Sequence, residues 1–302
     1  MFTEKKVLFI YSVSPVHMGA GTTLGVVDNP IQRERHTEHP LMAGSGIKGA
    51  MRHEARGNGL KDDIPAIFGP ESHSSSQNAG AVSFSDGQIV LFPVRSLREG
   101  FVYATCPTAL ARLARLLDVA EIAHGIDAPK VAPEKCVALT DEVLDDGKLV
   151  LEAYEYEHDP SGRDVLKRTA EWLAENAFVK STANEFFRDK VKKHTVLLND
   201  GEFAFFVKNA TVVEPHVRID DTTGTAEGGG LFFTENLPPE SLMVSLMMAS
   251  DERRNNGDAR KAAELAGMVA SAFNGKLLQI GGDATTGRGQ VVLRFIGDGG
   301  AQ

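Results

Sequence analysis

Runs of hydrophobic residues near both ends of the chain predict buried strands. Val7–Ser14 is apolar, β-branched and aromatic, and it stops at Pro15. Leu242–Met248, Leu277–Ile280 and Val291–Phe295 have the same character. Because strands lie at both ends of the chain, we expect the terminal strands to be able to pair in one sheet.

Helical periodicity marks other segments. A helix is predicted from Pro107 through Leu117, because its leucines recur on one face. Asp164–Phe178 predicts a second amphipathic helix, and the alanine-rich Asp258–Phe273 a third. Ser45 fits the N-cap of a fourth helix, over about Gly46–Arg56.

The remaining pattern predicts turns and short strands. Ala81–Asp86 and Gln88–Pro93 flank an Asp-Gly dipeptide, which is typical of a hairpin. Phe203–Val207 and Thr211–Val213 are predicted strands, and the Gly- and Thr-rich segment that follows favours a hairpin from about Val217 to Phe233. Strands interleaved with a few helices indicate an α+β fold of the split βαβ type. We interpret residues 1–302 as a single domain with large insertions in one core.

The excess of acidic over basic residues lies in one segment of the chain. The chain has 32 Lys and Arg against 41 Asp and Glu, a formal net charge of −9. From Asp118 to Asp159 there are 12 acids and 3 bases, so the remainder holds 29 of each. This balance excludes a mainly electrostatic binder of naked duplex DNA, but not a structured groove that holds one strand. We interpret the acidic segment, an insertion at about residues 118–160, as a solvated surface.

The composition disfavours a disulfide-rich protein, a zinc-binding protein and a membrane protein. Cys106 and Cys136 are the two cysteines, too few for a disulfide framework or a structural zinc site. His36 and His39 form an H-x-x-H pair with no cysteine nearby, which disfavours zinc. No apolar run approaches about 18 residues, so no membrane partner and a cytoplasmic location are expected.

Three polar, glycine-rich blocks are candidates for chemistry. The first, His17–Asp28, is also compatible with an ordinary flexible loop. In the second, Lys48 and Arg52 line up near a helix N-terminus, where a phosphate can bind, although a solvated helix face explains them equally well. The third block, residues 281–289, contains Arg288 and is also compatible with a wide hairpin loop.

Taken together, the three blocks resemble the RAMP superfamily of CRISPR proteins, and within it the backbone subunits of type III-B (Cmr) effector complexes. The similar segments are LGVVDNPIQRERHT, SGIKGAMR, EGGGLFFTENLPPESL and GGDATTGRGQV. The resemblance extends over nearly the whole chain, and its first block is the most specific part.

The resemblance implies a fold, partners and a reaction. The fold is an RRM-like (ferredoxin-like) core with insertions and a projecting hairpin. Copies of such subunits form a helical filament along a CRISPR guide RNA together with other Cmr subunits. Each copy interrupts guide–target pairing and cuts the complementary target RNA. The reaction depends on a divalent metal, Mg²⁺ or Mn²⁺, bound only with RNA, and the nucleophile is the target's own 2′-hydroxyl.

The resemblance also implies site residues. Asp28 matches the essential acid and a possible metal ligand, and His17 matches a nearby histidine whose role is catalytic or positional. A second acid matches Glu227, with Glu235 as an alternative. The family's guide-contacting serine and lysine match Ser45 and Lys48, whereas Ala43 and Gly46 depart from the usual family sequence around that serine. The expected RNA-binding residues are Gln32, Arg33, Arg35, Ser45, Lys48, Arg52, Gly281, Gly282 and Arg288.

Two alternatives remain at this point. A purely structural subunit would have the same fold and RNA groove without cutting. A more remote alternative is an enzyme that trims CRISPR precursors alone. For Phe203, Phe205 and Phe206, core packing is favoured over stacking on bases.

Overall fold

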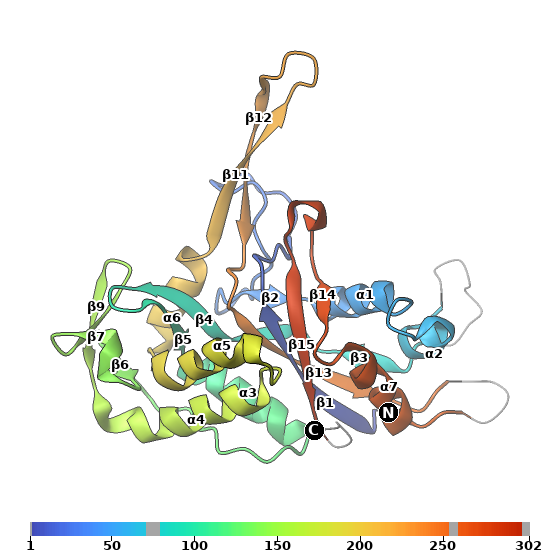
Figure 1. Cartoon of the computed structure of the whole chain (residues 1–302), viewed down its shortest axis with the longest axis horizontal. Coiled ribbons are helices and arrows are strands. Elements are labelled where there is room, and N and C mark those ends of the chain that lie inside the picture. Colours follow the sequence, from blue (N-terminus) through green and yellow to red (C-terminus); the bar gives the residue numbers. More distant parts are fainter. Residues whose placement is uncertain (1, 71–78, 254–258, 298–302) are drawn as a thin grey trace.

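The computed structural model of the chain describes residues 2–70, 79–253 and 259–297. The fold is of the α+β class. One large sheet runs through the body, and a two-stranded hairpin projects from it (Figure 1). Within the described ranges, no helix has the length and apolar character needed to cross a membrane.

Thirteen strands of the described chain form the large sheet. They are β1 (Glu4–Ser12), β2 (Leu41–Met42), β3 (Val82–Phe84), β4 (Gly87–Ser96), β5 (Gly100–Thr105), β6 (Lys135–Ala138), β7 (Leu144–Asp145), β8 (Lys148–Leu151), β9 (Tyr154–His158), β10 (Thr195–Leu197), β13 (Leu242–Ala249), β14 (Leu277–Gln279) and β15 (Gln290–Ile296). Their order is β14-β15-β1-β13-β4-β5-β10-β6-β9-β8-β7, with β2 on β4 and β3 on β13. β1 pairs antiparallel with β13 and β15, so the prediction that the terminal strands can pair is confirmed.

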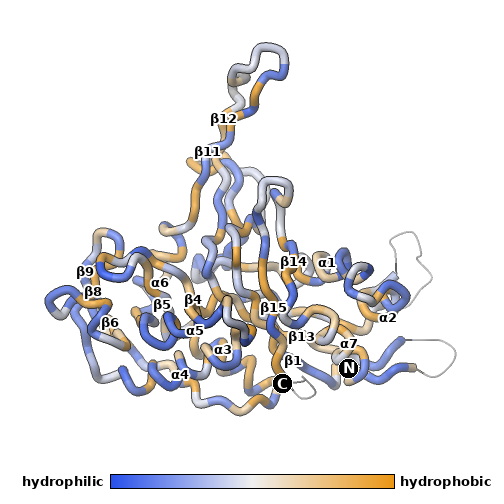
Figure 2. The backbone as a smooth tube through the Cα atoms, in the orientation of Figure 1, coloured by the Kyte–Doolittle hydropathy of each residue, from blue (hydrophilic) through white to orange (hydrophobic). Residues whose placement is uncertain are grey.

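Helices cover both faces of the sheet. They are α1 (Gly44–Glu54), α2 (Ile64–Phe68), α3 (Pro107–Val119), α4 (Arg163–Asn176), α5 (Thr182–His194), α6 (Asp200–Asn209) and α7 (Ala262–Phe273), with short 3-10 turns η1 (Lys61–Asp63), η2 (Asp141–Val143), η3 (Pro160–Gly162) and η4 (Ala284–Thr286). Alternate residues of β1 therefore enter different cores. Leu8 and Ile10 pack in the cluster that contains residues of α1 and α7, whereas Phe9 and Tyr11 pack with residues of α3 and α4. Burial on both faces explains the unbroken apolar run in the sequence, visible as the hydrophobic colour of the central strands in Figure 2.

The predicted N-cap at Ser45 is wrong. α1 begins at Gly44, Ala43 occupies the cap position without a side-chain hydrogen bond, and Ser45 is exposed. The Gly44 N–H instead donates to the Asp86 carboxylate at 2.8 Å. The acceptor comes from a residue 42 positions later in the chain, so the local pattern around the helix could not reveal it.

The predicted hairpin around Asp86-Gly87 is also wrong. β3 and β4 do not pair with each other; both pair antiparallel with β13, at Phe84↔Met247 and Leu91↔Leu242. Asp86 lies between them and turns toward the start of α1. The Asp-Gly signal therefore marks a break between two strands on one side of β13.

The predicted strand Phe203–Val207 is a helix, α6. The Asn199 side chain caps it by accepting from the Glu202 N–H at 3.0 Å. Phe203 and Phe206 are fully buried, so their predicted core packing is confirmed, whereas Phe205 is 41% exposed. Phe203, Phe205 and Phe206 lie within four positions of the chain, and this dense aromatic run hides the helical spacing of the two that are buried.

The projecting hairpin consists of β11 (Val212–Ile219) and β12 (Ala226–Asn236). Its register pairs Val213 with Glu235 and Val217 with Leu231. The hairpin thus begins nearer the body than the predicted segment from Val217 to Phe233. At its tip the Asp220 carboxylate accepts from the N–H groups of the two following threonines, which stabilises the turn.

His39 is a buried titratable group beneath the loop that leads to β2. It is 2% exposed, and its ring lies edge-on to Phe203 at 5.2 Å between centroids. Burial first, and then the charge of Arg112, lowers the pKa of His39 from 6.5 to about 4, while Glu34 and Asp200 act in the opposite direction and His36 adds to the lowering.

This shift predicts a pH-dependent stability. Between pH 6.5 and 4 the unfolded chain binds a proton on His39 that the folded chain does not, so the stabilisation present above pH 6.5 falls as the pH decreases, by at most about 3 kcal/mol. We expect His39→Leu to flatten the dependence of the free energy of unfolding on pH between 7 and 5, measured by urea denaturation. The exposed His53, replaced by Gln, is the control. Equal slopes in His39→Leu and the unmodified chain would contradict the assignment.

Candidate nucleic-acid interface

The first and third glycine-rich blocks meet at His17. The Gly289 N–H donates to the carbonyl oxygen of Pro15 at 2.8 Å, and the Gly282 N–H donates to that of His17 at 2.9 Å. Gly281 has φ +86°, and a Cβ atom there would lie 2.3 Å from the His17 oxygen. This close approach requires glycine. The two blocks therefore lie side by side.

The ring of His17 is held by the base of the hairpin. Its Nδ1 lies 2.7 Å from the carbonyl oxygen of Glu235. Because a carbonyl oxygen only accepts, Nδ1 carries the proton in this contact. In the neutral ring Nε2 is then the basic nitrogen, available to accept a proton.

Asp28 is fixed to the hairpin two residues away from that contact. The N–H groups of Asp28 and Asn29 both donate to the carbonyl oxygen of Phe233, at 3.1 and 3.0 Å. The Phe233 N–H donates back to Asp28 Oδ2 at 2.7 Å. The other oxygen, Oδ1, has no hydrogen-bond partner in the described part of the chain. One half of the carboxylate is a tether, and the other half remains available to a ligand.

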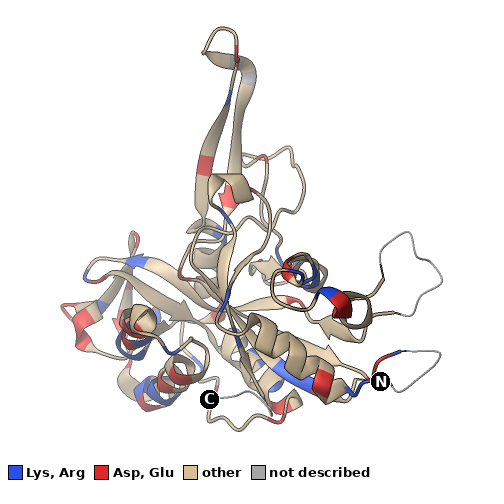
Figure 3. Cartoon of the chain, turned by 45° about the vertical axis from the view of Figure 1, so that its right-hand side comes forward, with Lys and Arg blue, Asp and Glu red and all other residues tan. Residues whose placement is uncertain are grey.

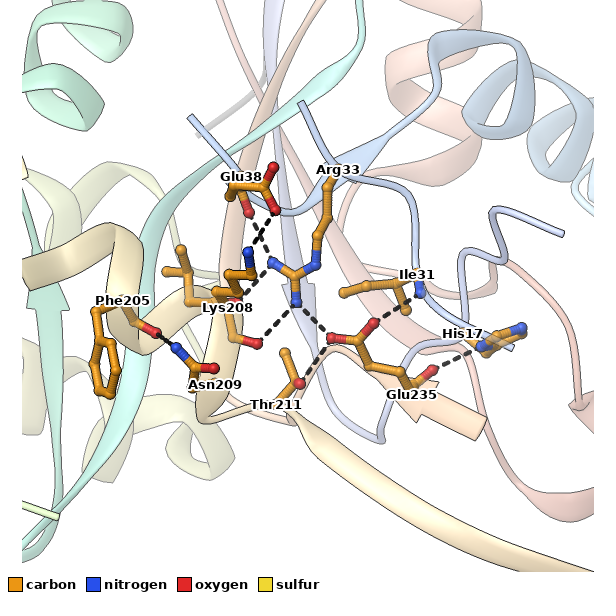
Figure 4. A network of polar contacts seen from close by, with 10 residues as sticks. His17, Ile31, Arg33, Glu38, Phe205, Lys208, Asn209, Thr211 and Glu235 are labelled. Atoms are coloured by element: carbon orange, nitrogen blue, oxygen red, sulfur yellow. Dashed lines mark hydrogen bonds and ion pairs between the residues drawn. The ribbon is translucent and has the colours of Figure 1, made fainter. Parts of the chain in front are cut away.

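The buried carboxylate of Glu235 connects the hairpin to the loop that follows Asp28 (Figure 4). Glu235 is 6% exposed. Its Oε2 accepts from the Ile31 N–H at 3.0 Å, and its Oε1 accepts from Thr211 Oγ1 at 2.8 Å and from Arg33 at 2.5 Å. All of these donors belong to the chain itself, so Glu235 acts as a structural anchor.

Arg33 is committed to partners within the protein. Besides Glu235, its guanidinium donates to the carbonyl oxygens of Glu38 at 2.7 Å and Val207 at 2.9 Å (Figure 4). Its side chain is 15% exposed. The structure therefore places this predicted RNA-binding residue in the anchor beneath the hairpin.

Its neighbours Gln32 and Arg35 lie differently. Gln32 Nε2 donates to the carbonyl oxygen of Gly19 at 3.0 Å, which links two parts of the loop. Arg35 is exposed and has no ion pair or hydrogen bond among the described residues. Arg35 is thus the cation of this loop that is free to contact a ligand.

The two cations of α1 contact different segments, Lys48 the strand β3 and Arg52 the end of α2. Lys48 Nζ donates to the carbonyl oxygen of Val82 at 2.7 Å, and Arg52 donates to that of Gly69 at 2.5 Å. Burial, and then the charges of Arg52 and Arg253, lower the pKa of Lys48. Both side chains donate to backbone carbonyl oxygens, and among the described residues no carboxylate pairs with either, so their positive charge is not neutralised within the chain.

Arg288 joins the C-terminal glycine loop to the hairpin. Its guanidinium pairs with Glu214 of β11 at 2.5 Å, and its Nε is buried without a hydrogen-bond partner in the described ranges. The glycine loop, the hairpin base and the His17 segment are therefore linked in one unit.

The two candidate second acids are far apart. Glu227 is in β12 near the tip, and its side chain lies outside the described residues. Along a strand that rises about 3.3 Å per residue, it is about 20 Å from Phe233, where Asp28 is held. Within one chain, Glu235 rather than Glu227 lies beside Asp28.

The described residues contain no group of three His, Cys, Asp or Glu side chains that could hold a metal ion. Asp28 offers one carboxylate oxygen. Mg²⁺ keeps several waters and is often held by one or two carboxylates plus substrate phosphates. The site therefore fits a metal only if other ligands come from outside the chain.

Sequence reasoning missed Thr211 and Glu214 and undervalued Glu235. A signal existed for Glu235, because it is a lone acid within the apolar run LFFTENL. A charge in such a run is expected to be paired when the strand is buried.

Comparison with known proteins agrees with this architecture. A model of the RAMP superfamily matches residues 9–292, and the chain belongs to this superfamily. The chain is 33% identical over 295 residues to the CRISPR system Cmr endoribonuclease Cmr4 of Pyrococcus furiosus, covering 96% of each. The crystal structure of oligomeric Cmr4 from the same organism is similar with a TM-score of 0.74 and 26% identity over 97% of each chain. A subunit in the cryo-EM structure of type III-B Cmr-beta bound to cognate target RNA shares the fold, with a TM-score of 0.70 and 17% identity over 97% of this chain and 98% of that one.

Proposed function

We propose that this chain is the backbone subunit of a type III-B CRISPR effector complex, and that it binds guide RNA and cuts complementary target RNA. Its partners are the guide, the target, further copies of itself and the other Cmr subunits. Its relatives support this, since they include an endoribonuclease, an oligomeric crystal structure and a complex with target RNA. A cytoplasmic location follows from this function.

We further propose that the core is RRM-like. The supporting order is β15-β1-β13 with β3 and β4 on the far side of β13, all antiparallel, and with α1 and α7 as the connecting helices. This corresponds to the βαββαβ arrangement of split βαβ folds. The acidic segment and the hairpin are then insertions in that core.

The observation that carries the catalytic proposal is the half-free carboxylate of Asp28 at the hairpin base. The hairpin forces a target nucleotide out of the stack, which gives its phosphodiester the freedom to reach in-line geometry. The target's 2′-hydroxyl attacks the adjacent phosphorus, and the bond to the 5′-oxygen breaks. In this proposal His17 Nε2 exchanges a proton with one of these oxygens, which the Nδ1 contact to Glu235 supports by leaving Nε2 as the basic nitrogen.

A divalent cation fits this site through Asp28 Oδ1 and RNA phosphate oxygens. When bound, it supplies neutralisation of the negative charge at the phosphate. Mg²⁺ and Mn²⁺ both prefer such oxygen ligands.

The RNA-binding surface follows from the same placement. Arg35, Lys48 and Arg52 supply positive charge, and the loop at Gly281 and Gly282 allows close backbone approach. Gln32, Arg33 and Arg288 act by shaping this surface, because their polar groups contact the protein itself.

Mapping of cut positions tests the function directly. We expect a reconstituted complex with guide RNA to cut a complementary RNA at regular intervals in Mg²⁺ and to stop in EDTA, while a non-complementary RNA stays intact. Intact target in both conditions would leave the structural subunit as the correct assignment. Cutting of repeat RNA by the isolated chain in EDTA would favour the precursor-trimming alternative.

A further inference from the structure

A cavity of about 610 Å³ lies between β9 and the N-terminal half of α6. Its walls include Tyr154, Glu157, Glu202 and Phe205. Phe205 points away from the Arg33–Glu235 anchor in Figure 4, so the cavity and the anchor lie on different sides of α6. Nothing in the proposed RNA chemistry uses this cavity.

The cavity contains an acceptor without a donor. Glu202 Oε1 accepts from the Glu134 N–H at 2.6 Å, but Glu202 Oε2 is buried and has no hydrogen-bond partner among the described residues. A buried carboxylate oxygen left unpaired costs free energy, so a donor from a ligand would be favoured there.

Aromatic side chains line the same cavity as Glu202. Tyr154 and Phe205 contact each other at 5.1 Å between ring centroids, and they are 47% and 41% exposed. Exposed aromatic rings next to carboxylates provide both a face for stacking a planar cation and acceptors for its N–H groups.

The side chains around the cavity are mostly acidic, which favours a positively charged ligand. Glu134, Glu155, Glu157 and Glu202 line it, against Lys135 and Lys148, of which Lys148 is paired with Glu155 at 2.9 Å. Except for Glu202, these residues belong to the segment with 12 acids and 3 bases, part of which appears as acidic strands and turns at the left of Figure 3. This field repels RNA and attracts a basic protein segment.

We propose that this cavity receives an arginine side chain from a basic segment of a protein partner. The guanidinium stacks on the ring of Tyr154, to which the Phe205 ring is nearly perpendicular, and donates to Glu202 Oε2. Arginine fits better than lysine, because only the planar guanidinium stacks and presents several N–H donors in a fixed fork. The inference stands independently of the RNA-cutting proposal.

The test uses the full chain and a fluorescein-labelled peptide of alternating Arg and Gly, with fluorescence anisotropy as the measurement. The matched probe replaces each Arg by citrulline, which has nearly the same shape without the charge. We expect saturable binding of the Arg peptide and at least tenfold weaker binding of the citrulline peptide. Lack of saturable binding, or equal binding of the two peptides, would overturn the proposal.

Variants locate the binding in the cavity. We expect Glu202→Gln and Tyr154→Ala each to weaken binding of the Arg peptide about tenfold. Glu202→Gln keeps an oxygen that can accept from the Glu134 N–H. Lys148→Ala removes a competing cation and is expected to strengthen binding of the Arg peptide severalfold. Asp127→Asn removes an exposed charge of the same segment outside the cavity and should change binding less than twofold. Equal losses of affinity in Asp127→Asn and Glu202→Gln would show that the peptide responds only to the overall charge of the segment, and would reject the site.

Discussion

Replacing Asp28 by Ala in the assembled complex is expected to lower target cutting by about 10²–10⁴-fold while guide and target binding stay unchanged. The variant loses both functions of the carboxylate: the tether to the Phe233 N–H and the free oxygen Oδ1. Asp28→Asn separates them, since its amide oxygen still accepts from Phe233 but the negative charge is gone. If charge at the phosphate is what matters, both variants lose cutting to a similar extent.

The measurement is single-turnover cleavage of labelled target, with filter binding on the same samples. Asp62→Asn is the matched control, because Asp62 is an exposed carboxylate on η1. Retained cutting in Asp28→Asn with loss in Asp28→Ala would assign Asp28 a tethering role. Retained cutting in both would reject a catalytic role for Asp28.

The second large effect is expected on stability, at the ion pair beneath the hairpin. The side chains of Arg33 and Glu235 are 15% and 8% exposed. Removing one partner of a buried pair leaves an uncompensated charge and costs about 3–5 kcal/mol. We therefore expect Glu235→Ala to lower the free energy of unfolding by this amount, measured by urea denaturation.

A double variant distinguishes an ion pair from simple packing. Arg33→Met combined with Glu235→Leu removes both charges and keeps most of the volume, so its loss of stability is expected to be smaller than that of Glu235→Ala alone. If the loss of stability in the double variant instead equals the sum of the losses in the two single variants, Arg33 and Glu235 do not act as a pair. Cutting by Glu235→Ala is also expected to fall, because Phe233, Glu235 and Arg33 together hold Asp28 and His17 in place.

The sequence was informative where a structural signal lies within a few residues. The apolar runs of β1, β13 and β15 and the leucine face of α3 are such signals, and these elements were predicted within a few residues of their ends. The α1 cap was missed because its acceptor, Asp86, arrives from a different strand. The helix at Phe203 was mistaken for a strand, since a short aromatic run has no clear period.

For the candidate site, residue types were predicted better than their roles. Asp28 and His17 do lie together at the hairpin base. Arg33 carries a charge that a sequence pattern assigns to RNA, but the fold uses it to neutralise Glu235. Only tertiary pairing decides which cation is internal and which, like Arg35, faces outward.

The position of β1 between β13 and β15 affects how the chain is made. During synthesis β1 leaves the ribosome before its hydrogen-bonding neighbours, which follow more than 200 residues later, from Leu242 and from Val291. Contacts so distant in sequence close large loops and slow folding. The apolar residues of β1 are therefore exposed until β13 and β15 have emerged, and a nascent chain stopped before β13 is expected to be prone to aggregation or to need a chaperone.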